Sequence, residues 1–175
     1  MFARAMKTAA VISALLTAAA YAAYAMYGGG LLESLYITFG ATAYHVIMRL
    51  MVGELFDRAL KNNVDYTRPW FRLRPFERRL YEALGVKRWK GRMPTYDPSL
   101  FSLKEHSFKE IAMAMCQAEL VHEACAALSF APLLVAGRLG GMAAFLITSI
   151  LSACIDLAFV IMQRYNRPRI IKLIR

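Results

Sequence analysis

Acidic residues are scarce in this sequence, and charge of either sign is missing from long stretches of it. The 175 residues include 12 Asp and Glu against 22 Lys and Arg, which gives a formal net charge of +10. No charged residue occurs from Thr8 to Leu32, and 58% of all residues are hydrophobic. A composition this apolar excludes an ordinary soluble domain of this size. Because the bases gather between the apolar runs and at the chain ends, the pattern also favours a membrane protein over a nucleic-acid binder.

Cysteine is scarce as well, and its spacing is not that of a metal or redox site. Cys116, Cys125 and Cys154 all lie in apolar runs and form no C-x-x-C motif. We interpret them as reduced thiols among apolar side chains, because a disulfide or a catalytic thiolate needs a different setting. The sequence also contains no internal repeat and no low-complexity linker.

Four apolar runs are each long enough to cross a hydrocarbon core of roughly 30 Å. We therefore predict an all-α integral membrane protein with four transmembrane helices arranged as two hairpins, in which residues 1–175 form a single membrane domain. The predicted spans lie at about 8–27, 34–50, 111–136 and 139–163. The first run also resembles a secretory signal because Arg4 and Lys7 precede an alanine-rich core. We interpret it as an uncleaved anchor.

Residues 51–110 differ in kind from the spans, since they contain most of the charges and both tryptophans. Phe76, Leu80 and Leu84 recur every four residues with arginines on the other faces, which predicts a basic amphipathic helix on the membrane surface. Basic residues also precede the first span and fill the tail at 164–175. The positive-inside rule therefore places both termini and this segment in the cytoplasm.

Polar side chains recur at helical spacing within three of the predicted spans. An ionised group near the middle of a bilayer costs about 2.5–3.5 kcal/mol, so these groups are expected to face one another. We predict that they enclose a polar cavity that opens toward the cytoplasm. The stripes contain Glu119 and His122 in the third span, Ser149, Ser152, Asp156 and Gln163 in the fourth, and Thr38, Thr42, His45 and Arg49 in the second.

Structural roles remain open for the same residues. Glu119 and His122 are compatible with a neutralised structural pair, and Asp156 with a hydrogen bond to a nearby serine. The Glu-x-x-His spacing is also used by di-iron carboxylate bundles, but those need the motif twice together with further glutamates. It occurs once here, so we predict no metal and no cofactor.

Several stretches along the second half of the chain form an ordered series. It resembles the glycosyl-4,4'-diaponeurosporenoate acyltransferases, small bacterial membrane proteins whose namesake esterifies a sugar hydroxyl of a carotenoid glycoside with a fatty acid. The Glu-x-x-His pair and the Gln-Arg-Tyr-Asn-Arg block are the most specific parts of the resemblance. The stretches are Leu84–Lys90, Met93-Pro94, Phe101–Lys104, Ala118–His122 and Gln163–Arg169.

The resemblance implies transfer of a fatty acyl group onto a hydroxyl or amine of a lipid-like acceptor. We predict His122 as general base, with Glu119 holding its tautomer and Asp156 as a third catalytic residue. The charge-dense block after the last span suits a phosphate or a carboxylate. The predicted substrate-binding residues are His45, Trp89, Lys90, Gln163, Arg164, Tyr165, Asn166, Arg167 and Arg169.

The predicted partners are membrane lipids, an acyl thioester or phospholipid donor and an amphiphilic acceptor, with no nucleic acid and with homo-oligomerisation left open. The predicted location is the bacterial cytoplasmic membrane. Two rival functions remain compatible with the sequence. One is a non-catalytic lipid-binding or accessory protein. The other is a small proton-coupled transporter that uses Glu119, His122 and Asp156 as a relay, although no inverted repeat is present.

Overall fold

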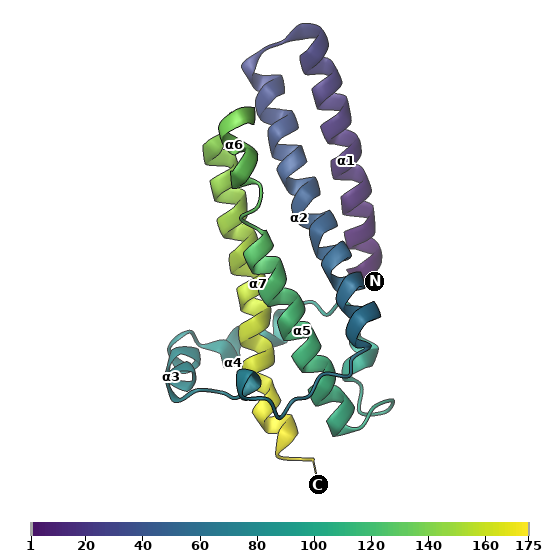
Figure 1. Ribbon diagram of the computed structural model, residues 1–175, viewed down its shortest axis with the longest axis vertical. Coiled ribbons are helices and arrows are strands. Elements are labelled where there is room, and N and C mark those ends of the chain that lie inside the picture. Colours follow the sequence, from purple (N-terminus) through teal and green to yellow (C-terminus); the bar gives the residue numbers. More distant parts are fainter. Residues whose placement is uncertain (1, 175) are drawn as a thin grey trace. The chain divides into compact units, whose positions relative to one another are not determined.

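The computed structural model describes residues 2–174, in which helices are joined by turns and no strand occurs. Figure 1 labels the α-helices and colours them along the sequence. The long helices are α1 (Phe2–Tyr27), α2 (Gly30–Leu60), α5 (Phe108–Leu128) and α7 (Met142–Ile171), and the short α6 (Leu133–Leu139) precedes α7. Between α2 and α5 lie η1 (Pro69–Phe71), α3 (Pro75–Ala83), α4 (Val86–Trp89), η2 (Lys90–Arg92) and η3 (Pro98–Phe101).

Four helical segments of the described chain are long and apolar enough to cross a membrane, which confirms the predicted all-α membrane fold. Two of these helices continue well beyond the apolar runs, α2 to Leu60 and α7 to Ile171. Arginine, lysine and glutamate have good helix propensity, so a helix continues readily where its apolar run ends. The four segments are Phe2–Tyr27, Gly30–Leu60, Phe108–Leu139 and Met142–Ile171.

The third of these segments is interrupted at residues 129–132, where the sequence indicated a continuous span. Pro132 has no backbone N–H and cannot make the hydrogen bond that a helix needs at that position. The backbone turns tighter instead, and the amides of Phe130 and Ala131 donate to the carbonyls three residues before them. The helix resumes as α6 at Leu133.

The chain divides into two compact units, and the first contains residues 3–52 and 125–155. In this unit α1 and α2 lie side by side (Figure 1), and Tyr36 packs its ring against those of Tyr21 and Tyr24. Gly28 and Gly29 join the two helices with positive φ angles of 66° and 98°, which glycine adopts without strain. A small apolar core in this unit contains Ile37, Ala41, Ala136 and Phe145.

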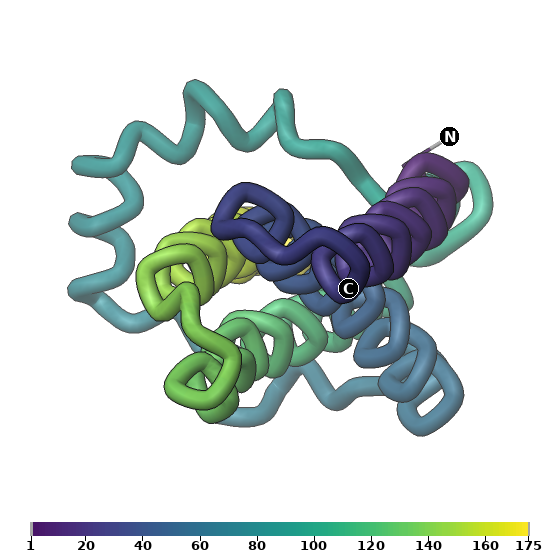
Figure 2. The backbone as a smooth tube through the Cα atoms, turned by 90° about the horizontal axis from the view of Figure 1, so that it is seen from above, coloured from purple at the N-terminus to yellow at the C-terminus, as the bar shows by residue number. Residues whose placement is uncertain are grey.

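The second unit contains residues 53–124 and the chain from 156 onward. Its segment between α2 and α5, called the arc below, is drawn in blue to teal in Figure 2. Val64, Phe71 and Cys116 are buried together and tie this segment to α5. The arc therefore brings side chains far apart in sequence against the ends of α5 and α7.

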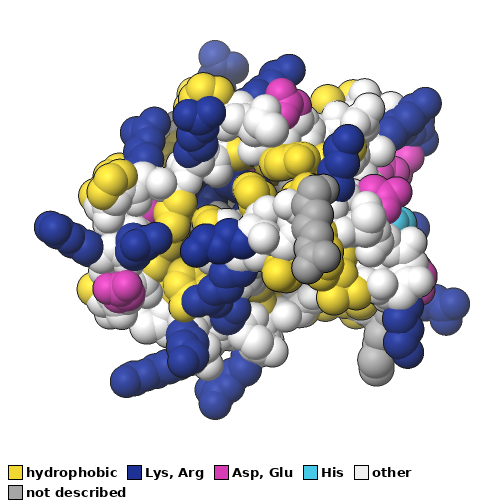
Figure 3. Space-filling model, turned by 90° about the horizontal axis from the view of Figure 1, so that it is seen from below, with side chains coloured by type: hydrophobic (Ala, Val, Ile, Leu, Met, Phe, Trp, Pro, Cys, Tyr) yellow, Lys and Arg dark blue, Asp and Glu magenta, His cyan; other side chains and the backbone are white. Residues whose placement is uncertain are grey.

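α3 is the amphipathic helix predicted within this segment, and its buried face is not its most apolar one. Phe76, Leu80 and Leu84 are exposed, whereas Glu77 and Tyr81 are buried. A helix on a membrane surface needs an exposed apolar edge of this kind. The placement of α3 on the membrane stays a prediction. Figure 3 shows a face of the molecule on which Lys and Arg side chains surround hydrophobic ones.

Candidate active site

α5 and α7 bring His122 and Asp156 into contact in the second unit. His122 Nδ1 lies 2.9 Å from a carboxylate oxygen of Asp156. Asp156 is fully buried, whereas the His122 side chain is 23% exposed and stacks on the ring of Phe159 at a centroid distance of 4.5 Å. An ionised carboxylate only accepts hydrogen bonds, so Nδ1 carries a proton in this contact.

The second ring nitrogen of His122, Nε2, has no hydrogen-bond partner among residues 2–174. With Nδ1 protonated, Nε2 holds the lone pair of a neutral imidazole. The ring is fixed by Asp156 on one edge and by Phe159 on one face. The ring is therefore held in a fixed orientation, which is what a general base would need.

Glu119 lies one helical turn before His122 but faces two arginines instead of the imidazole. Arg164 Nη1 donates to one carboxylate oxygen at 2.5 Å, and Arg167 Nη1 donates to the other. The side chains of Glu119 and Arg167 are 0% and 1% exposed. Asp156, and not Glu119, is thus the carboxylate that orients His122 here.

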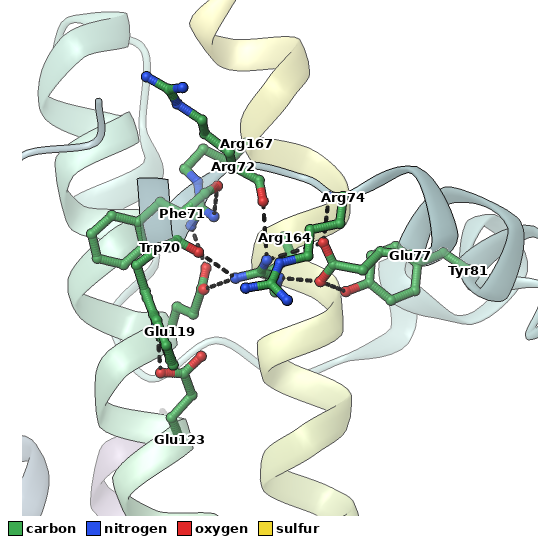
Figure 4. Close-up of polar contacts among 10 residues, drawn as sticks. All are labelled: Trp70, Phe71, Arg72, Arg74, Glu77, Tyr81, Glu119, Glu123, Arg164 and Arg167. Carbon is green, nitrogen blue, oxygen red and sulfur yellow. Dashed lines mark hydrogen bonds and ion pairs between the residues drawn. The ribbon is translucent and has the colours of Figure 1, made fainter. Parts of the chain in front are cut away.

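Arg164 is held by protein groups on all sides, as Figure 4 shows. Its Nε and Nη2 donate to the two oxygens of Glu77, at 2.6 and 3.0 Å. The remaining N–H groups reach Glu119 and the backbone carbonyls of Trp70 and Arg72. All five donors of this guanidinium are therefore used within the protein.

Arg167 bonds Glu119 and the carbonyl of Phe71 and also lies over the Phe71 ring at 5.1 Å, although its buried Nε has no hydrogen-bond partner among the described residues. Sequence reasoning predicted that Arg164 and Arg167 hold the substrate. The geometry favours a different role, in which both arginines neutralise buried carboxylates and fasten residues 70–72 to α5 and α7. Two acids and two bases offset one another in this cluster, so it buries no net charge.

Glu77 and Tyr81 extend this cluster into α3. Burial raises the pKa of the Glu77 carboxyl, but the hydrogen bonds from Arg164 and from the Arg74 backbone outweigh it and leave the pKa below its ordinary value. The Tyr81 hydroxyl donates to Glu77 at 3.1 Å. Burial, followed by the charge of Glu77, raises the pKa of Tyr81 to about 12. At neutral pH the carboxylate is therefore charged and the phenol is not.

A second group of predicted residues gathers around Tyr165, which lies between Arg164 and Arg167 in the sequence of α7. Lys90 Nζ donates to Asn166 Oδ1 and lies 5.1 Å from the centre of the Tyr165 ring. Arg169 lies over the same ring at 4.4 Å and donates to the Tyr165 hydroxyl at 2.9 Å. Partial burial, together with the nearby charge of Arg169, lowers the pKa of Lys90.

Two other predicted substrate-binding residues lie close to these groups in sequence. Trp89 donates its indole N–H to the carbonyl of Leu84 at 3.1 Å and so stabilises the turn that carries Lys90. Gln163 is buried on α7 directly before Arg164. Both remain predictions as substrate-binding residues.

His45 belongs to the first unit, where it joins a buried chain of polar groups. His45 Nδ1 lies 3.0 Å from Ser152 Oγ, which also accepts from Arg49 at 2.8 Å. Ser129 donates its only proton to the carbonyl of Cys125, so Ser152 donates to Ser129 and His45 donates to Ser152. This proton count indicates a structural network between helices, and a substrate contact at His45 stays a prediction.

Two hollows of the second unit share a wall formed by Trp70 and Glu123. The Trp70 indole N–H donates to Glu123 at 3.1 Å (Figure 4). The first hollow, of about 240 Å³, is lined by Trp70, Arg74, Phe76, Glu77, Glu123 and Arg164. The second, of about 280 Å³, is lined by Leu60 at the end of α2, by polar and apolar residues of the segment that follows, and by Leu120 and Glu123 of α5. Among residues 2–174, no three His, Cys, Asp or Glu side chains gather so as to hold a metal ion.

A family model for the glycosyl-4,4'-diaponeurosporenoate acyltransferases matches residues 67–175, which is more than half of the chain. The chain belongs to this family. The resemblance found in the sequence between Leu84 and Arg169 is thereby confirmed. No curated protein and no solved structure matches the chain.

The acyltransferase family match covers the groups just described in the second unit. His122, Asp156, the arginine cluster and the Lys90 to Arg169 group all lie within residues 67–175. His45 lies outside that range, in the first unit. The matched range therefore covers α5, α6, α7 and most of the arc before α5.

Glu77, Trp70 and Glu123 were not among the predicted site residues, although each lines the hollow beside the arginine cluster. A signal for Glu77 was present, because it is the one acid among Arg74, Arg78 and Arg79 and follows Pro75 at the start of a helix. Acids are favoured in that first turn. The pairing of Trp70 with Glu123 had no sequence signal, since 53 residues separate the two.

Proposed function

We propose that this protein is a membrane-embedded acyltransferase that moves a fatty acyl group onto a hydroxyl of a lipid-like, glycosylated acceptor. The observation that carries the proposal is the contact between His122 and Asp156, which orients an imidazole with one free nitrogen. Family membership supports the reaction class, because the family is named for an acyltransferase. The four apolar helices support a bilayer setting, in which a lipid-like acceptor dissolves.

His122 acts as the general base in this proposal. Its Nε2 takes the proton from the acceptor hydroxyl as the oxygen attacks the carbonyl carbon of the acyl donor. A new C–O bond forms, the bond to the donor's leaving sulfur or oxygen breaks, and the imidazolium returns its proton to that leaving group. Asp156 is a positioning residue that holds the imidazole tautomer and stabilises the imidazolium.

The arginine cluster positions the base, since the N–H donors of Arg164 are already used within the protein. Arg164 and Arg167 join α7 to Glu119 on α5, one turn from His122. They also fix the backbone at residues 70–72, which carries Trp70. A rigid junction of this kind keeps the catalytic groups within the small tolerance that catalysis needs.

The hollow beside Trp70 suits the polar head of the acceptor. Two exposed aromatic side chains, Trp70 and Phe76, form part of its wall, and the carboxylate of Glu123 offers a hydrogen-bond acceptor. Flat apolar rings with nearby polar groups are the common lining of small-ligand pockets. Glu123 directly follows His122 in α5. A head group bound to Glu123 would therefore lie at about the same depth in the membrane as the base.

The membrane orientation is part of the proposal. Basic residues dominate the arc between α2 and α5 and the last turns of α7. The positive-inside rule then places this end, and both termini, on the cytoplasmic side of a bacterial cell membrane. The acyl donor would thus reach the site from the cytoplasmic side or from the inner leaflet.

Lipid mass spectrometry of membranes tests the proposal. We would express the chain in a host that accumulates glycosyl-4,4'-diaponeurosporenoate and record all lipids that gain a fatty acyl mass. The wild type is expected to produce such a species, and His122→Ala to reduce it by about 100-fold or more. His106→Ala is the matched control, because His106 lies in the arc and in none of the clusters described.

The comparison of product levels requires that both variants are present in the membrane at wild-type amounts. Wild-type product levels in His122→Ala would show that His122 is not the general base. The absence of any acylated lipid with the wild type would instead favour a non-catalytic lipid-binding role.

A further inference from the structure

The basic residues at the end of α7 fall into two classes that differ in what satisfies them. Arg164 and Arg167 are buried and donate to carboxylates and backbone carbonyls. Arg169 is exposed and donates to a tyrosine hydroxyl. Neither Lys90 nor Arg169 has a carboxylate within ion-pair distance in the range 2–174. Only the second class therefore has charge to offer a ligand.

One aromatic ring holds these two cations together. Tyr165 is contacted by Lys90 at 5.1 Å and by Arg169 at 4.4 Å, and it packs edge-on against Tyr81 of α3 at 6.4 Å. Each cation is attracted to the electron-rich face of the ring. The two cations also repel each other, and a bound anion would relieve that repulsion.

The donors of this cluster are also incompletely used. Lys90 donates one of its three ammonium protons to Asn166, and Arg169 donates one of its five N–H groups to Tyr165. Because Lys90 can only donate, the contact turns the oxygen of the Asn166 amide toward Lys90 and leaves the NH₂ group free to donate. An ammonium and a guanidinium with unused donors thus contact one ring, and the amide of Asn166 lies beside the ammonium.

We propose that Lys90, Asn166 and Arg169 form an anion site that binds the phosphate group of the acyl donor. A phosphate offers several acceptor oxygens and charge, which match an ammonium and a fork-shaped guanidinium. The carboxylate end of a fatty acid is a weaker fit, because it has only two oxygens for these donors. The proposal rests on the proposed function in so far as it names the donor as the ligand.

The phosphate has two chemical sources, and both carry an acyl chain. One is the nucleotide and pantetheine portion of an acyl thioester, which arrives from the cytoplasm. The other is the head group of an acidic phospholipid, which arrives within the leaflet. Both present the same phosphate chemistry to the cluster, so binding measurements with each one distinguish them.

Isothermal titration calorimetry on the purified full-length protein in detergent tests this site without any turnover. The probes are coenzyme A and a short-chain phosphatidylglycerol, each titrated at low salt. The test variant is Lys90→Gln/Arg169→Gln, and the matched control is Arg78→Gln/Arg79→Gln. The control removes the same charge from exposed α3 residues that do not contact Tyr165.

The wild type and the control are expected to bind one probe equally well, and the test variant to bind it at least about tenfold more weakly. Binding of coenzyme A identifies a thioester donor, and binding of phosphatidylglycerol alone identifies a phospholipid donor. Equal affinity of the test variant and the control, or no binding of either probe to the wild type, overturns the proposal. If the double variant does not fold, Lys90→Gln alone is measured against Arg78→Gln.

Failure of this site and failure of the proposed reaction give different results. His122→Ala is expected to bind the probe like the wild type even though it makes no product, because His122 is not part of the cluster. If Lys90→Gln/Arg169→Gln binds normally while His122→Ala still abolishes product, the anion site is wrong and the reaction stands. If His122→Ala retains product while the cluster binds phosphate, the opposite conclusion follows.

Discussion

Glu119 of α5 and Arg167 of α7 form an ion pair that is shielded from solvent, since their side chains are 0% and 1% exposed. Arg164 binds the other oxygen of the same carboxylate. Removing one partner of such a pair leaves an uncompensated buried charge, which costs about 3–5 kcal/mol. This contact is therefore the most sensitive point of the junction between α5 and α7.

Glu119→Ala is expected to destabilise the protein by about 3–5 kcal/mol, because two arginines then lose their shared acceptor. The free energy of unfolding in mixed detergent micelles measures the effect. Glu110→Ala is the control, since Glu110 bonds only Ser107 at the exposed start of α5. A loss in Glu119→Ala no larger than in this control would contradict a structural role for the cluster.

Asp156 gives a different expectation, because it contacts His122, the proposed general base. Asp156→Leu removes the acceptor for His122 Nδ1 and is expected to lower the acyl-transfer rate by about 100-fold or more. Asp156→Asn retains a carbonyl oxygen for that hydrogen bond but not the charge, and about a tenfold loss is expected. Initial rates of acylated lipid formation in membranes check the series. Equal rates in Asp156→Leu and wild type would show that His122 needs no orienting carboxylate.

The helices were predictable from sequence because the length of an apolar run sets a span. The ends of the helices were not, since α7 continues through Arg164 and Arg167 to Ile171 with Pro168 inside it. A basic tail after an apolar run indicates where the hydrocarbon ends but not where the helix ends. The break at Pro132 was overlooked because the run of apolar residues continues through it.

The sequence predicted several residues of the candidate site, but it did not predict which of them bond to each other. Spacing showed that Glu119 and His122 share a face of one helix, and it suggested that they bind each other. In the structure Glu119 bonds Arg164 and Arg167, while Asp156 bonds His122. Helical periodicity fixes which side chains share a face, whereas the partner across the interface depends on packing between helices.

Glu77 provides a pH dependence whose sign follows from its environment. The pKa of this carboxyl is lower in the folded protein than its ordinary value of 4.5, because hydrogen bonds from Arg164 and Arg74 outweigh burial. The stabilisation by ionised Glu77 is therefore complete above the ordinary pKa and is lost as the pH falls through the lower, folded-state pKa. The melting temperature of the wild type is expected to fall over this acidic range.

Glu77→Gln is expected to melt at a lower temperature at neutral pH and to lose less stability on acidification, because it has no proton to take up at this position. Melting temperatures in detergent between pH 7 and about pH 3 check this, with exposed Glu82→Gln on the same helix as the control. A curve for Glu77→Gln that is parallel to the wild type would mean that another carboxylate controls the acid transition.

Two glycines with similar backbone angles offer a matched test of packing in the first unit. Gly28 and Gly141 have φ angles of 66° and 68°, so any other residue meets the same conformational strain at each. A Cβ at Gly28 meets nothing within 4 Å, whereas one at Gly141 lies 3.0 Å from two side-chain atoms of Ile37.

Gly28→Ala is expected to cost about 1–2 kcal/mol from strain alone. Gly141→Ala is expected to cost about 1–3 kcal/mol more, because Ile37 must move within a packed core. Unfolding free energies of both variants in the same detergent test this, and equal losses would show that Ile37 yields without cost.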